Sequence, residues 1–369
     1  MKATFKNARP DPLAPEGEQM QSDTFDPITT PYSVRESDFP QRGSLEEQLV
    51  FLLRYVTLAP STHNTQPWKF ALIPGGIELY ADYTRRMPVV DPGHRELLMS
   101  IGAAVFTLRV AADRFGFDCR VAYNYSGDSE RPLATAMLTA RGGPPGDAEK
   151  LFASIVRRHT NRSPFLLSRL PESILLRIRA LESVGGASLW VSTDGALNSQ
   201  VGDLVAAAEQ LQLADPAYRR GLAEWIRPNQ TLAADGVSGA ALGLNAAASA
   251  LEPWSSRVLD AGRKKAASDK NLCAEAPGLV VVQSEDSVPH WLSSGEILQH
   301  LLLKATGEGL HHSYFNMPVQ VPDLRVRLRK LLGLASWPQL LLRIGFSLTE
   351  APPSPRRPLD EMIFSTMIR

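Results

Sequence analysis

Pro60-Ser61-Thr62-His63-Asn64-Thr65-Gln66-Pro67-Trp68 is the most informative stretch of this 369-residue sequence. It stands between a predicted helix, which stops before Pro60, and a predicted strand over residues 66–73. Short polar side chains in such a turn present hydroxyl, amide and backbone donors to the polar edge of a ligand. An ordinary capped turn is the alternative for a string of this kind taken alone.

Helices and strands are predicted on both sides of this turn. Ser44-Leu45-Glu46-Glu47 is a capping box that opens the first helix. A second helix with a buried apolar face follows Asp91-Pro92, and a strand is expected at 119–121. The Gly- and Pro-rich segment 141–146 then marks a division near the middle of the chain.

The same order recurs after this division. A helix is predicted from Leu170 and a strand over 187–191, and a second capping box at 293–296 is expected to open another helix. The apolar runs 279–282 and 339–346 predict strands buried on both faces. Aligning Glu96-Leu97-Leu98 with Glu296-Ile297-Leu298 suggests an internal duplication, as in a symmetric dimer whose subunits have been joined.

Four segments follow from this organisation. Residues 1–40 are expected to be an extended or disordered arm, 41–146 a first half, and 147–369 a second half with an insertion at about 216–271. The insertion is either a lid, with Trp225 and Trp254 in its flanks, or a solvent-exposed addition that does not contact the site.

Two arginine-rich segments are candidate anion sites. In Arg157-Arg158-His159-Thr160-Asn161-Arg162, alternate residues of an extended segment point the same way, so Arg158, Thr160 and Arg162 can converge on one anion. A solvated basic surface run is the alternative. Pro355-Arg356-Arg357-Pro358 follows the last predicted strand and is weak evidence by itself.

Composition excludes several classes of protein. Lys plus Arg and Asp plus Glu both number 39, which argues against a general binder of nucleic acid or acidic membranes. Cys119 and Cys273 are too far apart in sequence for a CxxC motif and suit a reducing compartment. With no secretory signal or apolar span, a cytoplasmic protein is expected. His290 and His311-His312 lack the spacing of metal ligands, so no metal is expected.

Together the three motifs resemble the nitroreductase family of flavoproteins, and the fused, Acg-like subgroup in particular. The 60–68 string resembles its flavin-edge motif, 158–162 its phosphate segment, and Arg356-Arg357-Pro358 its second phosphate anchor. The resemblance implies an α+β fold with a mixed sheet flanked by helices, in which two fused, degenerate halves form an internal pseudo-dimer. It also implies FMN as cofactor, with NADH or NADPH as a transient electron donor.

The resemblance assigns roles to individual residues. Arg158, Thr160, Arg162 and Arg356 would bind the FMN phosphate, with Arg357 a weaker candidate. Ser61, Thr62 and Asn64 would contact the isoalloxazine ring or the ribityl chain, and Gln66 would assist. Met317, Gln320 and Val321 belong to the loop expected near N5 of the ring. His63 is a further candidate inside the flavin-edge motif, and a simple turn residue is the alternative. The family often has an acid followed by glycine where this chain has Gln320-Val321. No catalytic acid or base is assigned.

The second, mirror-image site is expected to be dead. Its phosphate segment would be near 32–36, where one arginine remains, and its edge motif would be 181–186, which lacks the Asn-x-Gln-Pro-Trp string. One FMN per chain and a monomer are therefore expected.

Three functions stay open at this point. The first is an oxidoreductase that passes electrons from NAD(P)H to a small acceptor such as a nitroaromatic or a quinone. The second is a flavin-holding or sequestering protein with a covered site and little turnover. The third is a pseudo-enzyme without flavin, against which the intact arginine segments argue.

Overall fold

The computed structural model describes residues 25–126, 128, 130–141, 149–251 and 262–366. The helices that position the site are α1 Leu45–Val56, α2 Arg95–Arg114, α3 Glu149–Ile155, α4 Glu172–Arg179, α5 Gly195–Ala214, α6 Pro216–Ala223, α8 Gly262–Ala274, α9 Val288–Gly307, α10 Met317–Gln320 and α11 Pro322–Leu331. The strands are β1 Trp68–Ile73, β2 Gly76–Ala81, β3 Phe117–Tyr123, β4 Ala134–Ala140, β5 Ser188–Ser192, β6 Ile226–Arg227, β7 Val237–Ser238, β8 Gly278–Ser284, β9 His311–Tyr314, β10 Trp337–Gly345 and β11 Ile363–Thr366.

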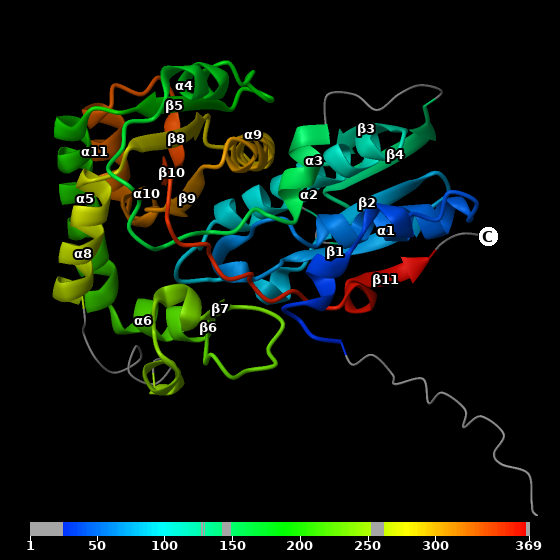
Figure 1. Cartoon of the computed structure of the whole chain (residues 1–369), viewed down its shortest axis with the longest axis horizontal. Coiled ribbons are helices and arrows are strands. Elements are labelled where there is room, and N and C mark those ends of the chain that lie inside the picture. The colour runs from blue at the N-terminus through cyan, green and yellow to red at the C-terminus, as the bar shows by residue number, and fades with distance from the viewer. Residues whose placement is uncertain (1–24, 127, 129, 142–148, 252–261, 367–369) are drawn as a thin grey trace, which may run out of the picture.

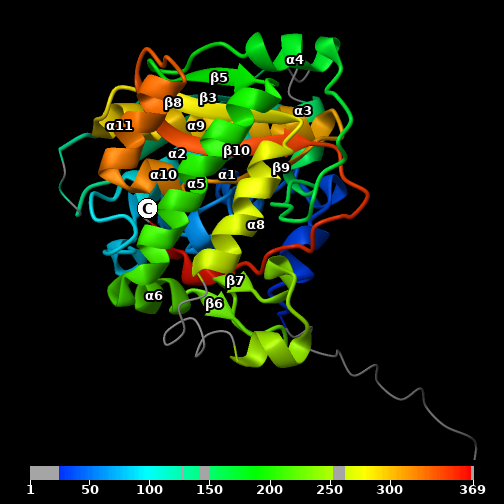
Figure 2. The same cartoon turned by 90° about the vertical axis from the view of Figure 1, so that its left-hand side faces the viewer.

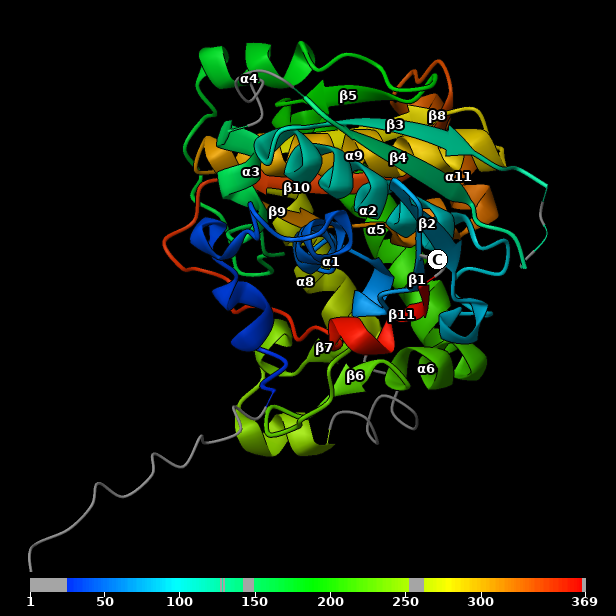
Figure 3. The same ribbon diagram turned by 90° about the vertical axis from the view of Figure 1, so that its right-hand side faces the viewer.

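The first half is built on a five-stranded mixed sheet with the order β11-β1-β2-β4-β3. Neighbouring strands are antiparallel except β1 and β11, which run parallel with Phe70 opposite Ile363. Helix α1 begins at the predicted capping box, in which Ser44 and Glu47 exchange hydrogen bonds, and it packs with α2 over the sheet (Figure 3). Both predicted helices and both predicted strands of this half are confirmed.

The second half is built on an antiparallel sheet with the order β5-β8-β10-β9. Its central strands β8 and β10 are buried on both faces, as their apolar runs predict. Val280 and Leu342 pack on the side of α9, whereas Val281 and Leu341 pack on the side of α5, because successive side chains alternate across a strand. Figure 2 shows α5 and α8 side by side over this second face.

Helices α2 and α9 pack against each other at the centre of the molecule (Figure 1). Both have 20 residues, and Gly102 and Gly295 are each the eighth, counting from Arg95 and Val288. A Cβ atom on Gly102 would lie 1.9 Å from the carbonyl oxygen of Leu292, and one on Gly295 would lie 1.9 Å from that of Met99. The crossing therefore needs a glycine in each helix, and the two sets of contacts are equivalent under a shift of 193 residues (295 − 102).

This shift corrects two expectations for α9. The segment 293–296 does not open the helix, which begins at Val288 after Ser287 with a proline in its first turn. The alignment of Glu96 with Glu296 implies a shift of 200 residues and is wrong by seven, about two helical turns. The helix ends fit the correct shift, since Gly116 and Gly309 follow α2 and α9 with φ of 80° and 77°.

The predicted segments also need correction at both ends of the chain. Residues 25–40 are not an extended arm, because they form two 3-10 turns, Thr30–Ser33 and Glu36–Asp38, and bury Val34 in the first core. Residues 1–24 lie outside the described part. After β10 the chain crosses back to the first half, where β11 completes the first sheet beside β1 (Figure 1).

The predicted insertion at 216–271 divides into two parts. Helix α6 and the short strands β6 and β7 lie outside both main sheets, whereas α8 packs along α5. Cys273 of α8 is buried in the hydrophobic cluster between α5 and the second sheet, which also contains Val281 and Leu341. Within the described ranges no helix is long and apolar enough to cross a membrane.

The α+β class with a mixed sheet flanked by helices is confirmed. The strands form two separate main sheets. The two halves are joined by the packing of α2 against α9 and by the C-terminal segment, which returns to the first sheet as β11.

Candidate functional site

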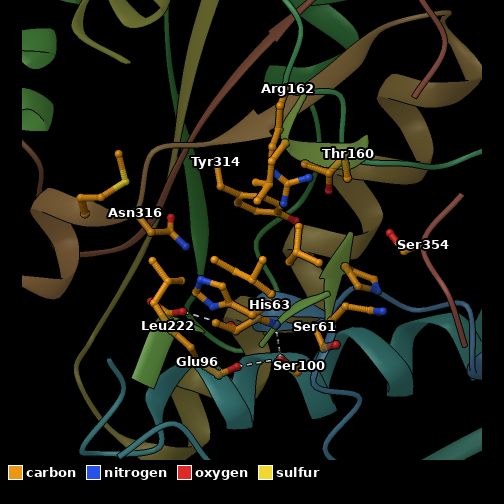
Figure 4. Close-up of a pocket in the computed structure, with 18 of the residues that line it drawn as sticks. Ser61, His63, Glu96, Ser100, Thr160, Arg162, Leu222, Tyr314, Asn316 and Ser354 are labelled. Atoms are coloured by element: carbon orange, nitrogen blue, oxygen red, sulfur yellow. Dashed lines mark hydrogen bonds between the residues drawn. The ribbon is translucent and has the colours of Figure 1, made fainter. Parts of the chain in front are cut away.

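A cavity of about 330 Å³ lies where the two halves and the insertion meet. This volume is within the range of small-molecule and cofactor sites. Its wall combines polar residues of the 60–64 turn, arginines of the second half, and apolar residues of α6 and the following loop. Figure 4 shows Ser61, His63 and Glu96 on one side of it and Thr160, Arg162 and Tyr314 on another.

Ten of the thirteen residues predicted to contact a cofactor line this cavity. They are Ser61, Thr62, His63, Asn64, Arg158, Thr160, Arg162, Met317, Gln320 and Arg356. Gln66, Val321 and Arg357 are not among the lining residues. Val321 caps α10 and α11, and Gln66 and Arg357 contact each other behind the wall, where the Arg357 backbone N–H donates to Gln66 Oε1 at 2.9 Å.

The 60–68 turn is held in an unusual backbone conformation. His63, Asn64 and Gln66 have φ of 48°, 57° and 50°, a region that non-glycine residues rarely adopt. Ser61 Oγ stabilises the turn by accepting a hydrogen bond from the Gln66 backbone N–H at 2.9 Å. Strain of this kind persists where the surrounding structure fixes it, and it is concentrated at functional sites.

The side chain of Asn64 positions another residue of the wall. Its Oδ1 accepts a hydrogen bond from Arg356 Nη1 at 2.6 Å, and its Nδ2 donates to the carbonyl oxygens of Pro355 and Gly236. Because these bonds occupy both ends of the amide, the side chain of Asn64 holds Arg356 in place in this structure.

Arg158 and Arg356 converge at one end of the cavity. Both are nearly inaccessible, at 3% and 2% exposure, and both donate to the carbonyl oxygen of Leu58, at 3.3 and 3.2 Å. Neither forms an ion pair with any carboxylate of the described ranges, and neither Nε atom has a hydrogen-bond partner there. Burial, and for Arg158 the nearby Arg356, lowers their pKa values.

Two buried guanidinium groups without a carboxylate are costly to the protein and favour binding of an anion between them. Thr160 and Arg162 line the same cavity, whereas His159 packs edge-on against Tyr32 and Asn161 donates to the carbonyl oxygen of Thr349. The alternation expected for an extended segment is therefore present.

His63 lies against the cavity as a neutral side chain. Burial, together with the charge of Arg162, lowers its pKa to about 4. Its Nδ1 has no hydrogen-bond partner among the described residues. A neutral imidazole next to a cationic wall adds a polar edge without adding charge.

Glu96 is a wall residue whose role the sequence did not reveal. Its carboxylate accepts hydrogen bonds from Thr62 Oγ1 at 3.0 Å and from Gln320 Nε2 at 2.7 Å, and lies 3.5 Å from Arg95 Nη2. Burial raises its pKa even though Arg95 opposes the shift. The available signal in the sequence is a carboxylate in the first turn of a largely apolar helix.

Glu96 connects the two halves at the cavity. Gln320 of α10 donates to it and in turn accepts a hydrogen bond from Gln212 Nε2 of α5 at 2.9 Å. A chain of side chains therefore runs from Thr62, in the first half, through Glu96 and Gln320 to Gln212.

The insertion covers this wall and is tied to the 60–68 turn. Gly236 N–H donates to the carbonyl oxygen of Asn64, and Gln66 Nε2 donates to that of Ala234 at 2.8 Å. Asp235 forms ion pairs with both Arg85 and Arg227. An insertion without contact to the site is therefore excluded, whereas gating by it stays a prediction.

The two tryptophans of the insertion are not part of this wall. The guanidinium groups of Arg85 and Arg227 lie 5.4 and 5.8 Å from the ring centroid of Trp225, which lines a separate hollow. Trp254 lies outside the described residues.

The pseudo-equivalent position in the other half is filled by side chains. Under the 193-residue shift, the cavity residues Ala103 and Asn316 correspond to Glu296 and Tyr123. Tyr123 donates a hydrogen bond to Glu296, which also pairs with Arg109 at 3.0 Å. The segment 181–186, expected to replace the edge motif there, lies against α9, and a Cβ atom on Gly185 would lie 2.2 Å from Ser293 Oγ.

The described residues contain no group of three or more His, Cys, Asp or Glu side chains arranged to hold a metal ion.

Curated relatives match most of the chain. A Mycobacterium tuberculosis protein named "Putative NAD(P)H nitroreductase" is 27% identical over 336 residues, which cover 88% of this chain and 92% of that protein. Another from the same strain, "Putative NAD(P)H nitroreductase acg", is 27% identical and covers 82% of this chain and 91% of its own length. No family model matches. The resemblance to Acg-like nitroreductases inferred from the motifs is confirmed.

Solved structures give weaker matches. The FMN and NADPH-dependent nitroreductase NfnB of a bacterium given as "sphigopyxis sp. strain HMH" is 22% identical, with a TM-score of 0.39 over 58% of this chain and 97% of that one. The FMN-dependent NfnB of Mycobacterium smegmatis, in complex with NADPH, is 16% identical, with a TM-score of 0.37 over 59% of this chain and 98% of that one. At these scores the likeness does not support a conclusion about function.

Proposed function

We propose that this chain, an Acg-like relative of the nitroreductases, binds one FMN in the cavity and transfers electrons from NADH or NADPH to a small acceptor such as a nitroaromatic or a quinone. The observation that carries the proposal is the pair of buried arginines, Arg158 and Arg356, that have no carboxylate partner among the residues the structure describes. They lie in one cavity with the 60–64 turn.

The residues present fit a bound FMN. A phosphate at the arginine end would lie against the guanidinium groups of Arg158 and Arg356, with Arg162 and Thr160 as further donors. The ring would extend toward the 60–64 turn, Glu96 and Gln320. When bound, FMN accepts a hydride and passes electrons on, so the protein needs to supply only binding, orientation and exclusion of water.

The charges along the cavity suit this orientation. The cationic end would hold the phosphate, and the neutral His63 and the apolar Met99 and Leu298 would surround the less polar ring. Asn64 would act through Arg356 in addition to any contact of its own. The curated relatives named NAD(P)H nitroreductases support the choice of electron donor.

A purified sample tests the proposal directly. We expect a yellow protein with one FMN per chain, and bleaching of its absorbance by NADH or NADPH under anaerobic conditions. A colourless protein that also fails to bind added FMN would refute it.

A flavin-holding protein with little turnover is the second candidate, and one observation favours it. Asp235 and the neighbouring backbone tie the insertion to the 60–68 turn, so the insertion lies against a wall of the cavity that the cofactor would occupy. A yellow protein that neither NADH nor NADPH bleaches would identify this function.

A further inference from the structure

Helix α6 of the insertion contributes a tyrosine to the wall of the cavity. Tyr218 and Leu222 are four residues apart and therefore lie on one face of α6, and both line the cavity. Figure 4 shows Leu222 among the residues that line the cavity, together with Glu96 and His63. The Tyr218 hydroxyl forms no hydrogen bond with any residue of the described ranges.

Each of the other polar side chains on this side of the cavity forms at least one hydrogen bond or ion pair. Glu209 and Lys265 form an ion pair at 3.0 Å. Arg219 Nη1 donates to the carbonyl oxygens of Leu213 and Ala214, and Ser238 Oγ accepts from a backbone N–H. Among the polar side chains on this side of the wall, as far as the structure describes it, Tyr218 alone forms no hydrogen bond or ion pair.

The surroundings of Tyr218 keep its hydroxyl protonated. Burial raises its pKa most, and the negative charges of Glu209 and Glu96 raise it further. The hydroxyl therefore remains a donor across the physiological range. Glu96, Thr62 and Gln320, whose side chains meet at the Glu96 carboxylate, line the same cavity.

We propose that Tyr218 is a catalytic residue of the acceptor site, where its hydroxyl donates a hydrogen bond to an oxygen of a quinone carbonyl or a nitro group. This inference rests on the proposed function. For a quinone, NAD(P)H gives up a hydride, the acceptor gains two electrons and one proton from it, and water supplies the second proton. Tyr218 keeps its own proton and stabilises the negative charge that grows on the acceptor oxygen.

The choice of acceptor isolates this hydrogen bond. Menadione has carbonyl oxygens, whereas ferricenium accepts one electron and has no oxygen atom to bond. Protein that carries FMN, reduced beforehand with dithionite, is mixed with each acceptor in a stopped-flow instrument. We expect Tyr218→Phe to lower the rate constant with menadione by about 10- to 100-fold and to leave that with ferricenium within about twofold.

The exposed tyrosine Tyr125 provides a matched control, and Tyr125→Phe should change neither rate constant. Equal slowing with both acceptors, no slowing with either, or loss of FMN from Tyr218→Phe would each overturn the inference. Absence of FMN from the unmodified protein would instead refute the proposed function, so the two failures are distinguishable.

Discussion

Replacing Arg158 and Arg356 by methionine removes the two buried charges at the cavity end while keeping most of the side-chain volume. A hydrogen bond from a charged group contributes about 1.5–3 kcal/mol, so each single substitution should weaken FMN binding by about 10- to 150-fold. The double substitution should weaken it by about 10²- to 10⁴-fold. The two effects need not add, because both guanidinium groups share the carbonyl oxygen of Leu58.

The same substitutions, which weaken FMN binding, should not lower the thermal stability of the protein without FMN. An unpaired buried charge destabilises a fold, so the thermal midpoint of the apoprotein should stay constant or rise. FMN is titrated into apoprotein while its fluorescence is followed, and unfolding is measured by circular dichroism. Arg357→Met is the control, since that side chain lies behind the wall against Gln66. Unchanged FMN affinity in the double variant would show that the phosphate is placed wrongly.

Further predictions concern stoichiometry, gating and pH. Absorbance and light scattering should give one FMN per chain and a monomer, and a tight dimer with flavin between chains would contradict the fused arrangement. Asp235→Asn weakens the ion pairs with Arg85 and Arg227, so if the insertion gates the site it should speed bleaching by NAD(P)H in stopped flow; an unchanged rate would exclude such gating. Burial lowers the pKa of His63 to about 4 and that of His159 to about 3. Because the unfolded chain binds these protons below about pH 6.5 and the folded chain does not, the free energy of unfolding should fall as pH drops from about 6.5 toward 4. In chemical denaturation, His159→Gln should reduce that dependence, and an unaltered slope would show that His159 does not contribute.

Local patterns predicted the elements that depend on local interactions. The capping box at Ser44, the apolar face of α2 and the two-sided burial of β8 and β10 follow from spacing and residue type alone. The capping box predicted at 293–296 is wrong, because these residues lie inside the buried helix α9. There Glu296 forms an ion pair with Arg109 and accepts a hydrogen bond from Tyr123, across the interface between the two halves.

The site was predicted in part for a related reason. Thr160 and Arg162 line the cavity because a short extended segment fixes their direction. Glu96 and Tyr218 could not be identified, because their position depends on how α2 packs beside the second half and how the insertion folds back. Gln66 was assigned to the cofactor, but its side chain is used by the insertion and by the backbone of Arg357.

The returning C-terminal segment has a consequence for biosynthesis. Arg356 precedes β11, which completes the sheet that starts with β1, nearly 300 residues earlier in the chain. While the ribosome is still making the second half, the first sheet lacks an edge strand and the anion site lacks one of its guanidinium groups. Cofactor loading would therefore come after synthesis of the segment from Arg356 through β11, and nascent chains that stop short of it would lack one of the two guanidinium groups that hold FMN.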